Sequence, residues 1–291
     1  MRQAAIIIIT TAVLAAGCGS ARHGASTTTV HATVQSAPAG PRIGIVGPLN
    51  LSVQGARIVH GSLAQVSDDD LVFVDASVAD VATVAAAAQA HPISHFALVG
   101  ASIKGFRRTN LVGLVLREAQ AARLGGVVAG LAAQEQGGPD ARVAWVGPQE
   151  NALEAAFAGG VHEALPGATV LHVWSKRIPA RCKEAALGAI ARGAVVVIAH
   201  GGLCALAAAA AAHQQNHVAL SITDFELPGV PATIVARDAV SGVYRGGEDL
   251  VFGATSGAIG IRQLDSRISA ETGLRARAAA QQLASGLPPT G

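Results

Sequence analysis

Short apolar runs alternate with longer helix-forming stretches along most of the chain, and residues 193–215 show the pattern most clearly. Ala194–Ala199 is an almost unbroken apolar run, which is typical of a strand that is buried on both faces. The turn His200-Gly201-Gly202 ends this run, and the alanine-rich stretch 204–215 is expected to form a helix. A strand, a glycine turn and a helix in this order make one half of a parallel βα unit.

The same alternation extends over residues 42–288. Strands are expected at 42–46, 71–74, 96–99, 110–116, 143–146, 169–174, 194–199, 218–222 and 233–235. Helices are expected at 52–66, 78–90, 117–134, 152–165, 179–192, 204–215, 240–252 and 274–285. Gly125, Gly126 and Gly130 predict close packing of the helix at 117–134 against a neighbour. This order predicts an α/β fold that is doubly wound, with mostly parallel sheets.

Loops that follow strands carry the candidate binding residues, because ligands of parallel α/β sheets lie beyond the carboxyl ends of the strands. The candidates in or near such loops are Asn50, Ser102, Trp174, His200, Asp224 and Arg237. Asn50 and Ser102 are candidates through their loop position alone.

The other candidates each have a plainer interpretation. Asp224 either accepts hydrogen bonds from a ligand or caps the next segment. Arg237 either pairs with Asp224 or an anionic ligand, or is a solvated surface charge. Trp174 is either a stacking platform or a core or hinge residue. His200 either contacts a ligand or only occupies its glycine turn.

Cys182 and Cys204 are expected to form a disulfide. A helix from 182 to 192 covers about 16 Å, and the strand at 194–199 returns over roughly the same length. Both cysteines are therefore expected at one edge of the sheet, where closing the loop contributes on the order of 3 kcal/mol. Two buried free thiols, or a metal pair with His200, are the alternatives.

The remaining acidic residues have simple interpretations. Asp68, Asp69 and Asp70 are expected in a solvated turn, because calcium loops space their ligands at alternate positions. No metal site is predicted. Glu118 and Glu135 are expected in helices, and nothing in the sequence places either beside a partner acid or base.

Composition narrows the class of function. Of the 291 residues, 51% are hydrophobic, 14% are charged and 3% are aromatic, so the chain can bury a large core, and its length suits two lobes. With 21 Lys and Arg against 19 Asp and Glu, no basic footprint for nucleic acid is present. The sequence has no dinucleotide or Walker loop and no nucleophile elbow. We therefore predict no cofactor and no catalytic residue, and we do not expect an enzyme.

The first 18 residues predict export. Arg2 precedes the apolar run 4–16, which is too short to span a bilayer comfortably. Leu14-Ala15-Ala16-Gly17-Cys18 resembles a bacterial lipoprotein signal, which implies a lipidated Cys18 and anchoring at the extracytoplasmic face of the cell membrane. An ordinary secretory signal is the alternative. Residues 19–41, rich in small and polar side chains, are expected to be a flexible tether with a span of roughly 25 Å.

Several segments, in order along the chain, carry a resemblance to a known family. They are FALV at 96–99, NLVGL at 110–114, REAQAARLGGVVAGL at 117–131, VAWVG at 143–147, FAGGV at 157–161 with Pro166, RCK at 181–183, AHGGLC at 199–204, 234–244 and 279–288. Together they resemble the basic membrane protein family, the purine-nucleoside-receptor type of solute-binding lipoprotein. The resemblance implies a two-lobed, type I periplasmic-binding fold that delivers a solute from an interlobe cleft to the membrane subunits of an ABC transporter.

The resemblance also implies a division into lobes, with residues 42–117 and about 225–271 in the first and 118–224 and about 272–291 in the second. Asp224 matches an acid that follows a late strand in the family, and Arg237 stands where members carry a ligand-contacting lysine.

The leading hypothesis is a solute-binding protein for a small polar ligand, with a nucleoside as one candidate. The family motif with Asp and Ser-Phe-Asn after the first strand is replaced here by Leu49–Gln54, and the acid after the strand 96–99 by Gly100. One alternative is therefore a member without a transport ligand that acts as an extracytoplasmic sensor or interaction module. Another is a Rossmann-like enzyme.

Overall fold

The computed structural model describes residues 40–286. The predicted signal with Cys18 lies outside these residues, as does the predicted tether up to residue 39. The strands are β1 (Arg42–Val46), β2 (Arg57–His60), β3 (Leu71–Asp75), β4 (His95–Val99), β5 (Leu111–Leu116), β6 (Arg142–Gly147), β7 (Thr169–Trp174), β8 (Ala194–Ala199), β9 (Val218–Ser221) and β10 (Asp249–Phe252).

The helices alternate with these strands. They are α1 (Leu63–Val66), α2 (Val81–Ala90), α3 (Glu118–Gly137), α4 (Asn151–Ala164), α5 (Pro179–Ala191), α6 (Leu203–Gln214), α7 (Gly229–Val240) and α8 (Ala270–Ser285), with short 3₁₀ helices η1 (Ile222–Phe225) and η2 (Ala254–Ser256). Within residues 40–286, no helix combines the length and the apolar character that crossing a bilayer requires.

The strands form two sheets, and every pairing within them is parallel. The first sheet has six strands in the order β10-β5-β4-β3-β1-β2, and the second has four in the order β7-β6-β8-β9. The predicted α/β fold with doubly wound, parallel sheets is therefore confirmed.

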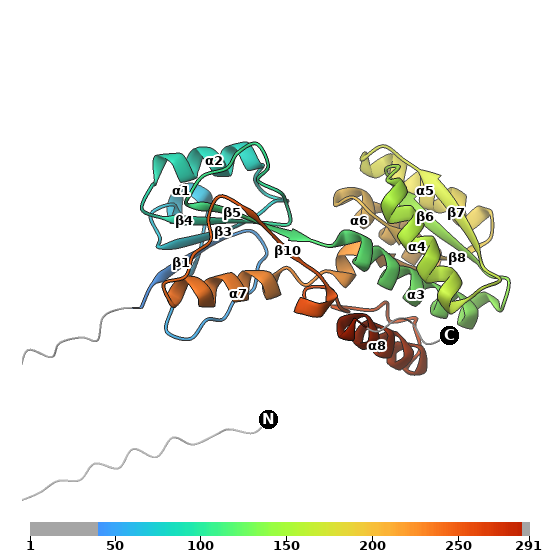
Figure 1. Cartoon of the computed structure of the whole chain (residues 1–291). Helices are drawn as coiled ribbons and strands as arrows, with labels where there is room; N and C mark the ends of the chain where they lie inside the picture. Colours follow the sequence, from blue (N-terminus) through green and yellow to red (C-terminus); the bar gives the residue numbers. More distant parts are fainter. Residues whose placement is uncertain (1–39, 287–291) are drawn as a thin grey trace, which may run out of the picture. The chain divides into compact units, whose positions relative to one another are not determined.

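Helices cover both faces of each sheet (Figure 1). In the six-stranded sheet, α1 and α2 bury Val72 and Leu98 on one face, and α7 packs on the other. In the four-stranded sheet, α5 and α6 bury Val197 on one face, and α3 and α4 bury Trp145 on the other. Burial on two faces explains why the strands read as continuous apolar runs instead of alternating ones.

The predicted helix at 52–66 is wrong. This segment contains β2 and the single turn α1, joined by a loop. Gly55 interrupts it with a φ of +80°, a conformation that a right-handed helix does not contain. The strand that follows is only half-buried, so its sequence lacks the apolar run that marks the other strands.

Two predictions near the C-terminus are also wrong. The predicted strand 233–235 lies inside α7, where Ala232, Val235 and Ala236 form a buried stripe with helical spacing. The predicted helix 240–252 contains the end of α7, a turn and β10. Gly242 and Gly247, both with positive φ, break this segment.

Close packing of the glycines in α3 is confirmed. A methyl group on Gly126 would collide with the carbonyl oxygen of Phe157 in α4. From the other side, a methyl group on Gly160 of α4 would collide with the carbonyl oxygen of Arg123. Gly130 faces the carbonyl of Val161 in the same way. The two helices therefore touch along their backbones.

The predicted solvated turn of three aspartates is confirmed for Asp68 and Asp70, which are exposed, but not for Asp69, which is buried. The side chain of Asp69 is only 3% exposed and binds the Nε of Arg42 at 2.8 Å. Asp70 accepts a hydrogen bond from the backbone N–H of Arg42, and Asp68 pairs with His91 at 2.8 Å. Burial raises the pKa of Asp69, and Arg42 opposes this effect. Asp69 and Asp70 therefore bind the start of β1, and Asp68 binds the end of α2.

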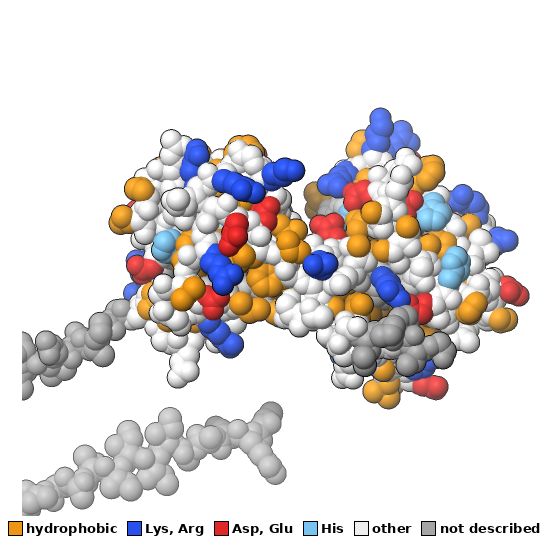
Figure 2. Space-filling view, viewed as in Figure 1, with side chains coloured by type: hydrophobic (Ala, Val, Ile, Leu, Met, Phe, Trp, Pro, Cys, Tyr) orange, Lys and Arg blue, Asp and Glu red, His pale blue; other side chains and the backbone are white. Residues whose placement is uncertain are grey.

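Charged side chains are dispersed over the face of the molecule that Figure 2 shows. Lys and Arg lie there in small separate groups, with acidic side chains beside several of them. Among the described residues as a whole, Arg123 pairs with Glu163 at 2.9 Å, and Arg181 pairs with Glu184 at 2.9 Å. No continuous basic surface of the described residues is visible on the face in Figure 2.

Candidate binding site at the strand ends

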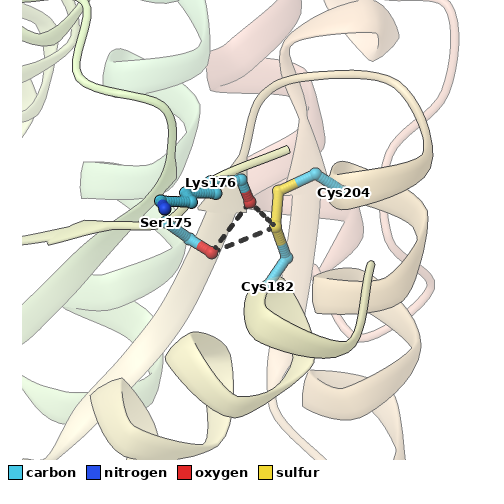
Figure 3. The surroundings of a disulfide bond; sticks show 4 residues. All are labelled: Ser175, Lys176, Cys182 and Cys204. Carbon is cyan, nitrogen blue, oxygen red and sulfur yellow. Dashed lines mark hydrogen bonds between the residues drawn. A yellow bond between two sulfur atoms is a disulfide. The ribbon is translucent and has the colours of Figure 1, made fainter. Parts of the chain in front are cut away.

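A disulfide joins the loops at the carboxyl ends of β7 and β8. Cys182 in the first turn of α5 is bonded to Cys204 at the start of α6, with the two Cα atoms 5.3 Å apart (Figure 3). The hydroxyl of Ser175 and the carbonyl oxygen of Lys176 lie 3.4 and 3.3 Å from the sulfur of Cys182. The predicted pairing is confirmed, and it excludes both free thiols and a cysteine metal site with His200.

Three side chains that follow three different strands meet next to these loops. They are Glu118 after β5, Glu150 after β6 and His200 after β8. One ligand atom from each lies within 4.8 Å of the others, and all three residues are half-buried. The sequence placed Glu118 beside no partner acid or base, and the fold supplies such neighbours because it brings together segments that are distant in the sequence. We call these residues the Glu118–Glu150–His200 group.

Glu150 is held in place from two sides. One carboxylate oxygen accepts a hydrogen bond from the guanidinium of Arg177 at 2.9 Å, and the other lies 3.3 Å from Nε2 of His200. The backbone N–H of Glu150 donates to the carboxylate of Glu154 at 2.8 Å. Arg177, which the sequence did not single out, therefore belongs to the site.

His200 is fixed by packing. Its side chain is 14% exposed, and its ring stacks on that of Trp145 with the centroids 6.0 Å apart. Trp145 is fully buried, and its indole N–H has no hydrogen-bond partner among the described residues. His200 is thus both a turn residue and one of the converging polar groups.

Trp174 is connected to Glu150 through the carboxylate of Glu154. Its indole N–H donates to Glu154 at 3.0 Å, and Glu154 also contacts His172 and the backbone of Glu150. The residue is 58% exposed, which excludes the core alternative and leaves its ring accessible for stacking.

Asp224 pairs with an arginine, although not with the one expected. Its carboxylate accepts a hydrogen bond from the backbone N–H of Ser221 at 2.8 Å and lies 3.8 Å from the guanidinium of Arg262. Burial raises the pKa of Asp224, while Ser221 and Arg262 act in the opposite direction. Arg237 is exposed on α7 and has no side-chain hydrogen bond or ion pair within residues 40–286. The hydrogen bond from Ser221 places Asp224 in a capping box of η1, in keeping with one of its two interpretations.

Glu226 is a further acidic residue that interacts with Glu118, and the sequence did not single it out. Burial raises its pKa to about 7, the nearby charge of Glu118 adds to this effect, and Arg262 opposes it. Glu118 and Glu226 are therefore close enough to repel one another. Glu226 stands in an irregular segment after η1, and neither periodicity nor a motif marks it.

Asn50 and Ser102 lie in loops of the six-stranded sheet. Asn50 is exposed, and its backbone lies against Gly229. The hydroxyl of Ser102 donates to Asp249 at 2.5 Å and accepts from the backbone N–H of Lys104 at 3.1 Å. Both hydrogen-bonding directions of Ser102 are thus used within the protein.

Comparisons with known proteins identify the fold. No family model matches the chain, and no curated protein matches its sequence. Solved structures do match. An ABC transporter solute-binding protein from Conexibacter woesei is 18% identical, with a TM-score of 0.60, over 87% of this chain and 99% of that chain. Another, from Aeropyrum pernix K1, is also 18% identical, with a TM-score of 0.54, over 84% and 92%.

A third structure has a different title. It is a transcriptional activator of the comK gene from Bacillus halodurans, 15% identical with a TM-score of 0.58, over 86% of this chain and 100% of that chain. At these identities the likeness concerns the fold. The chain has the parallel α/β fold of periplasmic-binding-protein-like structures, and its polar side chains gather where such sheets bind ligands.

Proposed function

We propose that this protein is an extracytoplasmic solute-binding protein that holds a small polar solute at the Glu118–Glu150–His200 group. The convergence of these three side chains at the carboxyl ends of the strands is the observation that carries the proposal. Parallel α/β sheets bind ligands at this edge, and a few convergent polar groups are the usual means of orienting them.

The chemistry of the group defines the class of solute. Carboxylates accept hydrogen bonds, so Glu118 and Glu150 suit hydroxyl or amino groups, and the imidazole of His200 either donates or accepts. The exposed ring of Trp174 offers a face for a planar or sugar-like part of the solute. A nucleoside, which combines hydroxyls with a planar base, is one candidate. Asn50, Ser102, Asp224 and Arg237 complete the set of proposed contacts.

The proposed mechanism is closure of two lobes on the solute. We assign residues 42–117 and about 225–271 to the first lobe, and 118–224 and about 272–291 to the second. Three chain segments connect the two sheets, after β5, after η1 and after β10. Such short connections absorb hinge motions in proteins that close on a ligand.

In this proposal the protein acts as a lipoprotein. The signal-like sequence that ends at Cys18 supports an anchor at the extracytoplasmic face of the cell membrane. The membrane subunits of an ABC importer are the proposed partners, and the basic membrane protein family is the proposed family.

A sensor or interaction module is the second candidate function. It is favoured by the fold match to a transcriptional activator and by Ser102, whose hydroxyl is already engaged by Asp249 and Lys104. A protein of this kind keeps the fold but responds to no transport solute.

A thermal-unfolding screen tests the proposal. The full chain is freed of metal with a chelator and heated with nucleosides, sugars, amino acids and peptides. A ligand at 100 times its Kd stabilises the folded state by about 2.7 kcal/mol, which raises the melting temperature by several degrees. Glu150→Gln should lower the shift to about half or less, because a roughly tenfold weaker Kd leaves about 1.4 kcal/mol of stabilisation. Glu163→Gln, which removes the exposed partner of Arg123, should keep the full shift. A flat response across the panel, both after chelation and with divalent cations restored, would contradict transport and favour the sensor.

A further inference from the structure

Beyond the solute class, we infer that Glu118, Glu150 and His200 bind a divalent transition-metal cation of the Zn²⁺ type. The inference rests on the proposed function because it names a ligand for the same site. It replaces the expectation of no metal, which was drawn from sequence spacing. The three ligand atoms come from three loops, so their proximity is invisible in the sequence.

The donor set and its dimensions suit such a cation. Two ligands of one zinc ion, each at about 2.0–2.2 Å, lie roughly 3.4 Å apart in tetrahedral geometry. Nε2 of His200 and the nearer oxygen of Glu150 are 3.3 Å apart, and Glu118 completes a triangle with no side longer than 4.8 Å. Binding of one ion requires Glu118 to move closer to the other two ligands than this upper limit.

The negative charge of the carboxylates around Glu118 also favours a cation. Glu118 is half-buried and has no hydrogen bond or ion pair from its side chain among residues 40–286. Glu118 and Glu150 bring two half-buried carboxylates together, with ligand atoms within 4.8 Å of each other. This arrangement is unfavourable unless a positive charge offsets it. Arg262 and Arg177 already pair with Asp224 and Glu150, so neither is assigned to Glu118.

Two of the three ligands are held before any ion arrives. His200 is stacked on the buried ring of Trp145, and Glu150 is fixed by Arg177 through the oxygen that faces away from His200. Restrained ligands lose little conformational freedom on binding, which favours affinity.

The type of metal follows from the ligands. An imidazole with two carboxylates suits Zn²⁺, Fe²⁺ or Ni²⁺, whereas Mg²⁺ and Ca²⁺ prefer oxygen ligands alone. Three protein ligands leave at least one position of a zinc ion open, as in exchangeable zinc sites. That position is available to a hydroxyl, amine or carboxylate of the solute.

Metal titration of the chelator-treated, untagged full chain tests the inference. Isothermal titration calorimetry with Zn²⁺ should give one site per chain. Glu118→Gln and His200→Asn should each weaken binding at least about tenfold, since changes even in the groups around metal ligands reach that size. His91→Asn, from the His91–Asp68 pair of the other sheet, and Glu163→Gln should leave the affinity unchanged. Circular dichroism verifies folding of every variant.

Co²⁺ gives an independent signature. Its visible absorption should intensify on binding to the wild type and change in His200→Asn, because the bands depend on the ligands. No Zn²⁺ binding, or equal affinity in site and control variants, would overturn the inference. Stabilisation by a solute in metal-free buffer, combined with absent Zn²⁺ binding, would overturn the metal site while keeping the proposed function.

Discussion

The acids near the strand ends of the two sheets differ in what they bind. Around the six-stranded sheet, Asp75 accepts from the backbone N–H of Ser77 at 2.8 Å, and Asp80 caps α2 by accepting from the backbone N–H of Thr83 at 2.8 Å. Asp249 accepts from the backbone N–H of Ile103 at 2.8 Å and from a serine hydroxyl. These carboxylates are satisfied by the fold itself.

Two acids beside α3, Glu118 at its start and Glu226 after η1, have less internal support. Glu118 has no side-chain partner within the described range, and Glu226 has a pKa raised to about 7 through burial and the charge of Glu118. Because polar groups away from water are normally paired, such exceptions mark places where a ligand completes the structure. The comparison therefore distinguishes acids that the fold satisfies from the acids that we propose for binding.

The largest expected effect comes from the disulfide, which staples only the strand ends of the four-stranded sheet. Replacing Cys182 and Cys204 together by Ala should lower the free energy of unfolding by about 3 kcal/mol, because the unfolded chain regains the freedom of the closed loop. Urea unfolding of the variant and of the reduced wild type measures the loss. Unchanged stability in both would show that the staple has no such role.

The close packing of α4 against α3 predicts the second-largest effect on stability. Gly160→Ala should destabilise the protein by about 2 kcal/mol, since the methyl group meets the backbone of α3. Its neighbour Gly159 has open space around it, so Gly159→Ala should instead stabilise by about 0.5–1 kcal/mol through better helix propensity. Urea unfolding of both variants checks the opposite signs, and equal signs would refute the close contact.

A matched pair of variants compares how much an acid of each kind contributes to stability. Asp249→Asn should cost about 1.5 kcal/mol of stability because two hydrogen bonds to a carboxylate are weakened. Glu118→Gln should change the stability by less than about 0.5 kcal/mol or raise it, because repulsion with Glu226 is removed. Chemical unfolding at neutral pH compares them. A large loss from Glu118→Gln would place this acid among the structural ones.

The smallest expected effect is a pH dependence of the stability that arises from Asp265. Its carboxylate accepts hydrogen bonds from the backbone of Ala219, which lies in the four-stranded sheet, and of Arg267. Burial raises the pKa of Asp265, but hydrogen bonds from the backbone N–H groups of Ala219 and Arg267 and from His213 outweigh burial and lower it. Its stabilising contribution is therefore full above the unfolded value near 3.8 and is lost as the pH falls through the lower folded pKa. Unfolding from pH 7 to pH 2 should show this loss in the wild type and a weaker slope in Asp265→Asn.

The sequence predicted the fold where both faces of a strand are buried. Apolar runs such as Leu71–Val74 and Ala194–Ala199 left little ambiguity, and α3 was marked by its glycines. Prediction failed where burial is partial or the segment is short. β2 has an exposed and half-buried pattern, and 233–235 belongs to a helix whose buried stripe becomes visible only over a longer window.

The site was predicted in part for a related reason. His200 and the disulfide were found because a glycine turn and a cysteine pair are local signals. Glu118, Glu226 and Arg262 were missed, since their roles arise from contacts between loops that are distant along the chain. Pairing with Asp224 was one of the alternatives for Arg237, but the arginine beside Asp224 is Arg262.

The most direct test of the account is the affinity for the solute that the thermal screen identifies, measured by calorimetry in variants of both regions. We predict that Glu118→Gln and Glu150→Gln each raise the Kd at least about tenfold, since hydrogen bonds to charged groups contribute about 1.5–3 kcal/mol. Asp249→Asn, a structural acid, should stay within about threefold of the wild type. A solute that binds equally well to all three variants would contradict the central claim.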